Sequence, residues 1–167
     1  MMSLTDFILK HWACDRMFCT TCGGIAGFIA SISAYEKQNP DLEGALTRLT
    51  NDDAARLSKQ DAWPLLRSSV LVRLDAEAKS RVFSSWNARA AADSDFAVGL
   101  LRWFSHGHEI PPELVHGLAE GILPAAQSSP EVRDLVAKVP KGQLRRASPA
   151  LARLLSLDPD QPGYRLQ

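Results

Sequence analysis

One group of residues near the start of the chain has types and spacing that point to a definite chemistry. His11, Cys14, Cys19 and Cys22 lie within twelve residues, and they include all three cysteines of the protein. Zinc prefers four nitrogen or sulfur ligands in a tetrahedron, and a structural site takes all four from the protein. The glycine after Cys22 permits a tight turn with both thiolates facing one ion. The sequence therefore predicts a structural Zn²⁺ site in the loop 11–24.

Several alternatives to this site stay open at the level of sequence. The fourth ligand can be a distant histidine in place of His11, either His106, His108 or His116, and the metal itself can be another thiophilic ion. The three cysteines can also be ordinary buried side chains. Their spacing resembles that of plant-type ferredoxins over residues 14–22 alone, but such a cluster needs a fourth cysteine.

A second polar cluster has the sequence Ser-His-Gly-His-Glu over residues 105–109. Two histidines beside a glutamate can bind a metal or carry protons. The competing interpretation is a solvated loop between helices, and we favour it because no third partner is visible nearby. No nucleophile elbow, phosphate-binding loop or carboxylate pair of a hydrolase is present, so no catalytic residue is assigned.

Positive charge is concentrated near the end of the chain. Residues 133–153 contain six cations and one anion, although Lys plus Arg equal Asp plus Glu over the whole chain. The candidate binding patch in this segment is Lys138, Lys141, Arg145 and Arg146. Such a patch suits phosphates or an acidic protein surface, but the aromatic side chains that stack on single-stranded nucleic acids are absent. A solvated loop between helices is again the plainer interpretation.

The elements that must position these residues are predicted to be short amphipathic helices. Capping residues or prolines mark their starts, at Ser3, Thr50 or Asn51, Trp63-Pro64, Asp93 or Ser94, Pro111-Pro112, Ser129-Pro130 and Pro149. No segment alternates with the period of a strand between turn signals. We therefore expect an all-α fold, an orthogonal bundle or short array of about eight to ten short helices, in which the zinc loop joins the first two and the four tryptophans lie in the core.

Length and composition bound the organisation of the protein. The 167 residues suit a single helical domain over 1–157, followed by a flexible C-terminal tail over 158–167 that contains two prolines and a glycine. The N-terminus lacks the pattern of a signal peptide, and no apolar stretch reaches the length of a membrane span. We expect a cytoplasmic protein that does not contact membranes, in which reduced cysteines favour metal binding.

These observations lead to three functional hypotheses. The first is a non-enzymatic, zinc-stabilised interaction or regulatory protein, like an immunity protein, an antitoxin or an adaptor, that binds a partner protein. The second is a nucleic-acid-binding regulator that uses the basic segment 133–153. The third is a metalloenzyme with an open zinc site, which requires that His11 is not a ligand.

Overall fold

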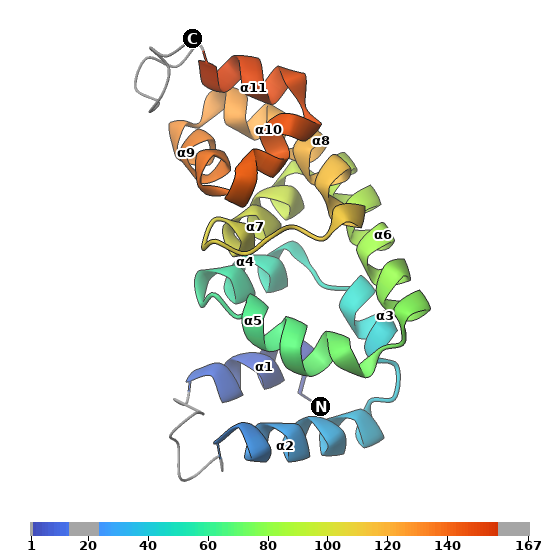
Figure 1. Ribbon diagram of the computed structural model, residues 1–167. Coiled ribbons are helices and arrows are strands. Elements are labelled where there is room, and N and C mark those ends of the chain that lie inside the picture. The colour runs from blue at the N-terminus through green and yellow to red at the C-terminus, as the bar shows by residue number, and fades with distance from the viewer. Residues whose placement is uncertain (1, 14–23, 157–167) are drawn as a thin grey trace. The chain divides into compact units, whose positions relative to one another are not determined.

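Every regular element in the described part of the chain is helical, as the sequence predicts (Figure 1). The computed structural model describes residues 2–13 and 24–156, and these ranges contain no strand. In chain order, the elements are α1 (Leu4–Ala13), α2 (Gly24–Gln38), α3 (Leu42–Thr47), α4 (Asn51–Lys59), α5 (Trp63–Leu65), the π-helical turn η1 (Leu66–Val70), the 3₁₀ turn η2 (Leu71–Arg73), α6 (Ala76–Ala92), α7 (Ser94–Phe104), α8 (Pro112–Ser128), α9 (Pro130–Lys138), the 3₁₀ turn η3 (Pro140–Gly142), α10 (Gln143–Ala147) and α11 (Pro149–Ser156).

The helix starts follow the capping residues seen in the sequence. Thr50 forms a capping box with Asp53: its hydroxyl accepts the Asp53 N–H at 3.0 Å, and its own N–H donates to the Asp53 carboxylate at 2.9 Å. Asp93 caps α7 and Ser129 caps α9 through the same side-chain contact with a backbone N–H in the first turn. These contacts satisfy N–H groups that have no partner inside the helix, which is why such residues fix helix starts.

Two segments differ from the sequence-based prediction. The helix expected to open at Trp63 is divided into α5, η1 and η2, because a π-helical turn interrupts the regular period. The segment 140–147, for which we favoured a solvated loop, contains η3 and the short helix α10. Leu144 is the one buried residue of α10, so the sequence carries no repeating apolar pattern there. These segments bring the α-helices of the described ranges to eleven.

The chain divides into two compact units, which we call unit 1 (Met1–Val82) and unit 2 (Phe83–Gln167). In unit 1, α1 contacts α4, and α2 contacts η1. Its fully buried side chains include Ile8, Ile32, Leu46, Leu57, Trp63, Leu66 and Leu71. The prediction that residues 1–157 form one helical domain is not tested by this division into compact units, and it stays a prediction.

In unit 2, helix α8 packs against α7, α9, α10 and α11. The side chains of Trp86, Trp103 and Phe104 are fully buried, and the two indole rings meet edge to face with centroids 5.7 Å apart. With Trp63 of unit 1, three tryptophans are therefore core residues, as predicted, while the side chain of Trp12 lies outside the described part. Among the described helices, none is long and apolar enough to span a membrane.

Candidate functional site

Of the four predicted zinc ligands, the structure describes His11. It lies in the last turn of α1, half-buried, with its ring centroid 4.6 Å from that of Phe7. Cys14, Cys19 and Cys22 lie outside the described residues, as do most of the loop 11–24 and the tail 158–167. Within residues 2–13 and 24–156, no group of three or more potential ligands is placed to hold a metal. The zinc site therefore stays a prediction.

The three remaining histidines lie in unit 2. His106 is exposed and His108 is half-buried in the segment between α7 and α8, while His116 on α8 pairs with Glu120 through Nε2 and Oε1 at 3.2 Å. In the described part of unit 2, too, no three potential ligands are placed to hold a metal. A distant fourth ligand for the cysteines stays a prediction.

The segment 105–110, which we call the histidine loop, is held to the chain that follows α9. The side-chain amide of Gln143 accepts the Ile110 N–H at 2.9 Å and donates to the Ile110 carbonyl at 3.2 Å. Lys141 Nζ lies 2.6 Å from Glu109 Oε1. Gly107 has φ +96°, a conformation that glycine adopts without strain. The histidine loop and the start of α10, which are more than thirty residues apart in the sequence, therefore lie side by side.

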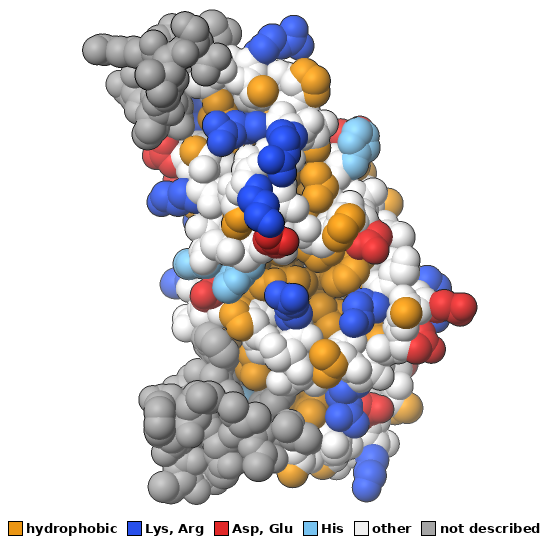
Figure 2. Space-filling model, viewed as in Figure 1, with side chains coloured by type: hydrophobic (Ala, Val, Ile, Leu, Met, Phe, Trp, Pro, Cys, Tyr) orange, Lys and Arg blue, Asp and Glu red, His pale blue; other side chains and the backbone are white. Residues whose placement is uncertain are grey.

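The four residues of the basic patch, Lys138, Lys141, Arg145 and Arg146, are all exposed. Figure 2 shows several Lys and Arg side chains gathered on the visible face of unit 2. Arg145 and Arg146 lie on α10, and Lys138 ends α9. Lys141 has a left-handed backbone, with φ 57°, which turns the chain between these helices.

The cations of the basic segment have different roles. Arg133 is half-buried, and its Nη1 donates to the Ala126 carbonyl at 2.8 Å, so it ties α9 to the end of α8. Lys141 is paired with Glu109. Lys138, Arg145 and Arg146 form no ion pair with any carboxylate of the described residues, and neither does the exposed Arg153 on α11.

Elsewhere in the described chain, arginine and carboxylate side chains are commonly paired. These pairs include Arg48–Asp41, Arg56–Asp6, Arg73–Glu36, Arg81–Glu43 and Arg102–Glu131. Exposed cations without an ion pair also occur in the described part of unit 1, among them Lys37, Lys59 and Arg67, so the feature of unit 2 is that four such cations follow one another closely in the sequence between α9 and α11. A cation held at the surface without a counter-charge is available to an external anion.

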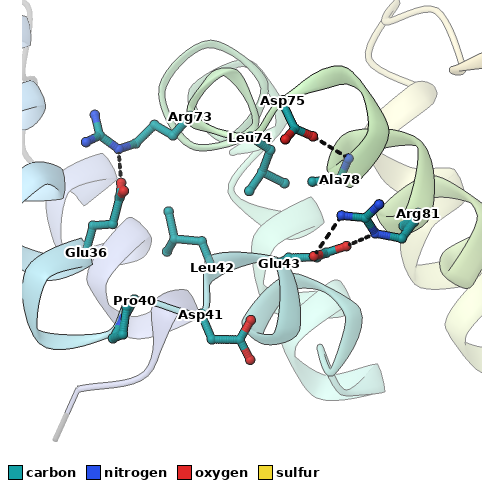
Figure 3. Close-up of a pocket in the computed structure, with 10 residues that line it drawn as sticks. All are labelled: Glu36, Pro40, Asp41, Leu42, Glu43, Arg73, Leu74, Asp75, Ala78 and Arg81. Atoms are coloured by element: carbon teal, nitrogen blue, oxygen red, sulfur yellow. Dashed lines mark hydrogen bonds and ion pairs between the residues drawn. The ribbon is translucent and has the colours of Figure 1, made fainter.

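A groove in unit 1 was not predicted from the sequence. It has a volume of about 310 Å³ and is lined by Glu36, Pro40, Asp41, Leu42, Glu43, Arg73, Leu74, Asp75, Ala78 and Arg81 (Figure 3). The pair Arg73–Glu36 joins η2 to α2, and the pair Arg81–Glu43 joins α6 to α3. No signal in the sequence links partners that are 37 and 38 residues apart.

The charged groups of this groove already have structural partners. Asp41 accepts the Gly44 N–H at 2.8 Å at the start of α3, and Asp75 accepts the Ala78 N–H at 2.7 Å at the start of α6. The hydrogen bond that Arg81 donates to the Glu43 carboxylate raises the pKa of Arg81, so the guanidinium stays charged in this pair. Since these groups serve helix starts or ion pairs, the groove is best explained as a contact that fastens α2 to η2 and α3 to α6.

Comparison of the chain with protein-family models, curated proteins and solved structures finds no match. The fold defines an all-helical class for the described residues, arranged in two compact units. In the described chain, the features that bear on function are therefore the basic patch and the residues around it.

Proposed function

We propose that the protein is a non-enzymatic interaction protein that binds an acidic partner protein through the basic patch of unit 2. The observation that carries this proposal is that three cations of the patch, Lys138, Arg145 and Arg146, are exposed and form no ion pair within the described chain, and the exposed Arg153 of α11 forms none either. Burying or pairing these cations at an interface removes no internal ion pair, so a complementary acidic surface gains the full interaction. Such surfaces speed association and select the partner more than they add affinity.

A protein partner is preferred to a nucleic acid on two grounds. Over residues 83–156, Lys and Arg exceed Asp and Glu by one, whereas nucleic-acid-binding domains carry a strong positive excess. The segment 133–153 also contains no aromatic residue on which a base could stack. A compact patch of four cations in a nearly neutral unit fits a local acidic surface better than a long polyanion.

The remaining parts of the proposal concern unit 1 and the cell. The loop 11–24 holds a structural zinc through His11, Cys14, Cys19 and Cys22, which stabilises the connection between α1 and α2. This proposal is supported by ligand spacing and by the place of His11 in the last turn of α1. The protein acts in the cytoplasm, where its thiols stay reduced, as an immunity-, antitoxin- or adaptor-like regulator.

The test of this function is a binding titration that compares charge-reversed variants. Arg145→Glu with Arg146→Glu is measured beside a matched control, Lys37→Glu with Lys59→Glu, which reverses two exposed cations of unit 1. The probes are a labelled glutamate-rich peptide and a labelled DNA duplex, read by fluorescence anisotropy. We expect the patch variant to bind the peptide roughly tenfold more weakly or worse, and the control to bind as the wild type does.

Two outcomes would decide against the proposal. If the patch variant retains wild-type affinity for the peptide, the basic patch is not the binding surface. If the wild type binds the duplex more tightly than the peptide, with a steep dependence on salt, the nucleic-acid-binding alternative replaces the protein partner.

A further inference from the structure

Ser148 lies between α10 and α11 and closely follows two cations of the basic patch. Arg145 and Arg146 precede it by three and two residues, and both are exposed without an ion pair in the described chain. Ser148 is half-buried, and its backbone is extended, with φ −136° and ψ 103°. Its hydroxyl accepts the Leu151 N–H at 3.2 Å, in the first turn of α11. A reactive hydroxyl and two arginines therefore share one short surface segment.

We propose that Ser148 is a phosphorylation site for an arginine-directed serine kinase, and that its phosphate weakens the binding of an acidic partner to the basic patch. The second half of this proposal rests on the proposed function, whereas the modification itself does not. Kinases select substrates partly by patterns of charge, and carboxylates in the substrate groove of an arginine-directed kinase pair with arginines shortly before the serine. Ser148 is the one serine of the chain with arginines both two and three residues before it.

The group transfer balances with ATP as the phosphoryl donor. The bond between the γ-phosphorus and the bridging oxygen of ATP breaks, and ADP leaves with that oxygen. A bond forms between the γ-phosphorus and Ser148 Oγ, and the hydroxyl proton passes to a base of the kinase. The product carries a charge of about −1.5 to −2 at neutral pH. That charge compensates Arg145 and Arg146, which are then less available to an external carboxylate.

A second serine of unit 2 shows which feature is particular to Ser148. Ser129 also precedes a proline at a helix start, its hydroxyl accepts the Val132 N–H at 3.3 Å, and its backbone is extended, with φ −128° and ψ 112°. No lysine or arginine lies in the sequence between Arg102 and Ser129. Because the two serines share the cap geometry and the following proline, they differ chiefly in the preceding arginines, and Ser129 is an internal control.

The segment that carries Ser148 is suited to local opening. A kinase takes its substrate as an extended segment, so α10 must unwind for the arginines to enter the groove. This helix has five residues, and Leu144 is its one buried side chain. Helices of this length have little stability of their own, and such segments open at a lower free energy than the whole fold does. After transfer, the phosphate lies at the N-terminus of α11, where negative charge is favourable.

The modification is tested by incubating the full chain with ATP and a panel of purified arginine-directed serine kinases, and by mapping the phosphate by mass spectrometry. We expect phosphate on Ser148 in the wild type, little on Ser129, and roughly tenfold less on Ser148 in Arg145→Gln with Arg146→Gln. Equal modification of Ser129, or modification of Ser148 that survives in the arginine variant, would show that the arginines do not select the site. Absence of phosphate on Ser148 with every kinase of the panel would overturn the proposal.

The effect on binding is measured with the labelled glutamate-rich peptide. Asp and Asn are both good helix caps, so Ser148→Asp and Ser148→Asn separate the added charge from the cap. We expect the phosphorylated chain to bind roughly tenfold more weakly and Ser148→Asp roughly threefold more weakly, because exposed ion pairs contribute little individually. Ser148→Asn should bind as the wild type does. Ser129→Asp, which adds the same charge at the start of α9, should weaken binding less.

The outcomes separate this proposal from the function on which its second half rests. Equal binding of the peptide before and after phosphorylation of Ser148, together with weaker binding by Arg145→Glu with Arg146→Glu, would overturn the regulatory role alone. Failure of the unmodified wild type to bind the peptide would overturn the proposed function and the regulatory role with it. The modification site is decided independently of both by the phosphate mapping.

Discussion

The charged side chains of this protein differ in whether they form a hydrogen bond or an ion pair within the fold. Asp6 of α1 accepts a hydrogen bond from Arg56 of α4 at 2.8 Å, although fifty residues separate the two. Arg133 is anchored on a backbone carbonyl. Arg145 and Arg146, in contrast, lie exposed on one short helix and form no ion pair within the described residues. This contrast, and not the number of cations, distinguishes a structural charge from one that is available to a partner.

The Asp6–Arg56 pair makes a prediction about acid titration. The hydrogen bond from Arg56, and after it that from Ser3, holds the pKa of Asp6 below its ordinary value of 3.8. A carboxyl whose pKa is depressed on folding adds stability above the unfolded pKa, and this stability is lost as the pH falls through the folded pKa. We therefore expect Arg56→Ala to raise the pKa of Asp6 toward 3.8 in a carbon-detected NMR titration.

A matched control for this prediction is Arg48→Ala, which removes the partner of Asp41 and should leave Asp6 unchanged. Since both carboxylates are exposed, neither variant should shift the thermal midpoint by much at neutral pH. An Asp6 that titrates at its ordinary value in the wild type would contradict the assigned hydrogen bond.

Residue types alone were enough to nominate the basic patch and the histidine loop, but not the contacts that join them. The exposure of Arg145 and Arg146 follows from their charge. The hydrogen bonds of Gln143 to Ile110 could not be predicted, because a glutamine amide has no sequence signal for a partner 33 residues away. The same holds for Arg73 and Glu36 in the groove of unit 1. Such pairings depend on tertiary geometry, which a single sequence does not reveal.

At the scale of elements, the approach of α8 to the last turns of α6 depends on two glycines. A Cβ built on Gly121 would lie 1.9 Å from the Ala90 carbonyl oxygen, and one built on Gly117 would lie 2.1 Å from that of Asn87. The Gly117 N–H also donates to the Asn87 side chain at 2.7 Å. Backbone atoms cannot yield as a flexible side chain can, so these positions admit no side chain without a shift of the helices.

Gly121→Ala is therefore expected to destabilise the protein even though alanine favours helix. The helix propensity of alanine contributes about 1 kcal/mol, whereas overpacking against backbone costs about 2–3 kcal/mol or more. We expect a net loss of about 1–2 kcal/mol or more in the free energy of unfolding, measured by denaturant titration. Gly107→Ala is the control: no atom lies within 4 Å of its Cβ, so its positive φ is the one cost, about 1 kcal/mol. A Gly121→Ala variant as stable as the wild type would contradict the close approach.

Helices were predictable from the sequence wherever a cap and an apolar repeat coincide. The helix starts expected near residues 50, 93 and 129 are confirmed, and the structure assigns the first two caps to Thr50 and Asp93 and not to Asn51 and Ser94. The interruption at η1 was not predictable, because Leu66 and Val70 keep helical spacing and are both buried. The existence of a helix is a local property, but the accommodation of one extra residue in a turn is decided by packing.

At the scale of the whole molecule, the division into two units separates the predicted functions. The cysteine loop belongs to unit 1, and the basic patch and the histidine loop belong to unit 2. Each unit has its own buried aromatic or aliphatic side chains, such as Trp63 in the first and Trp86 in the second. A metal that stabilises unit 1 therefore need not affect the binding surface of unit 2.

Removal of the metal tests this separation and the zinc site together. Elemental mass spectrometry of untagged protein should find about one zinc per chain, and His11→Ala and Cys22→Ser should lose it. After chelation, the backbone amides of α1 and α2 should lose protection from hydrogen exchange, while those of α8 and α11 keep theirs.

Wild-type protein without metal would exclude the zinc site. Retention of zinc by His11→Ala would assign the fourth position to water or to a distant residue such as His106, His108 or His116, and an open zinc site would then favour the metalloenzyme alternative. Equal loss of protection in α8 and α11 would show that residues 1–157 unfold as one domain, because a cooperative unit loses its protection as a whole.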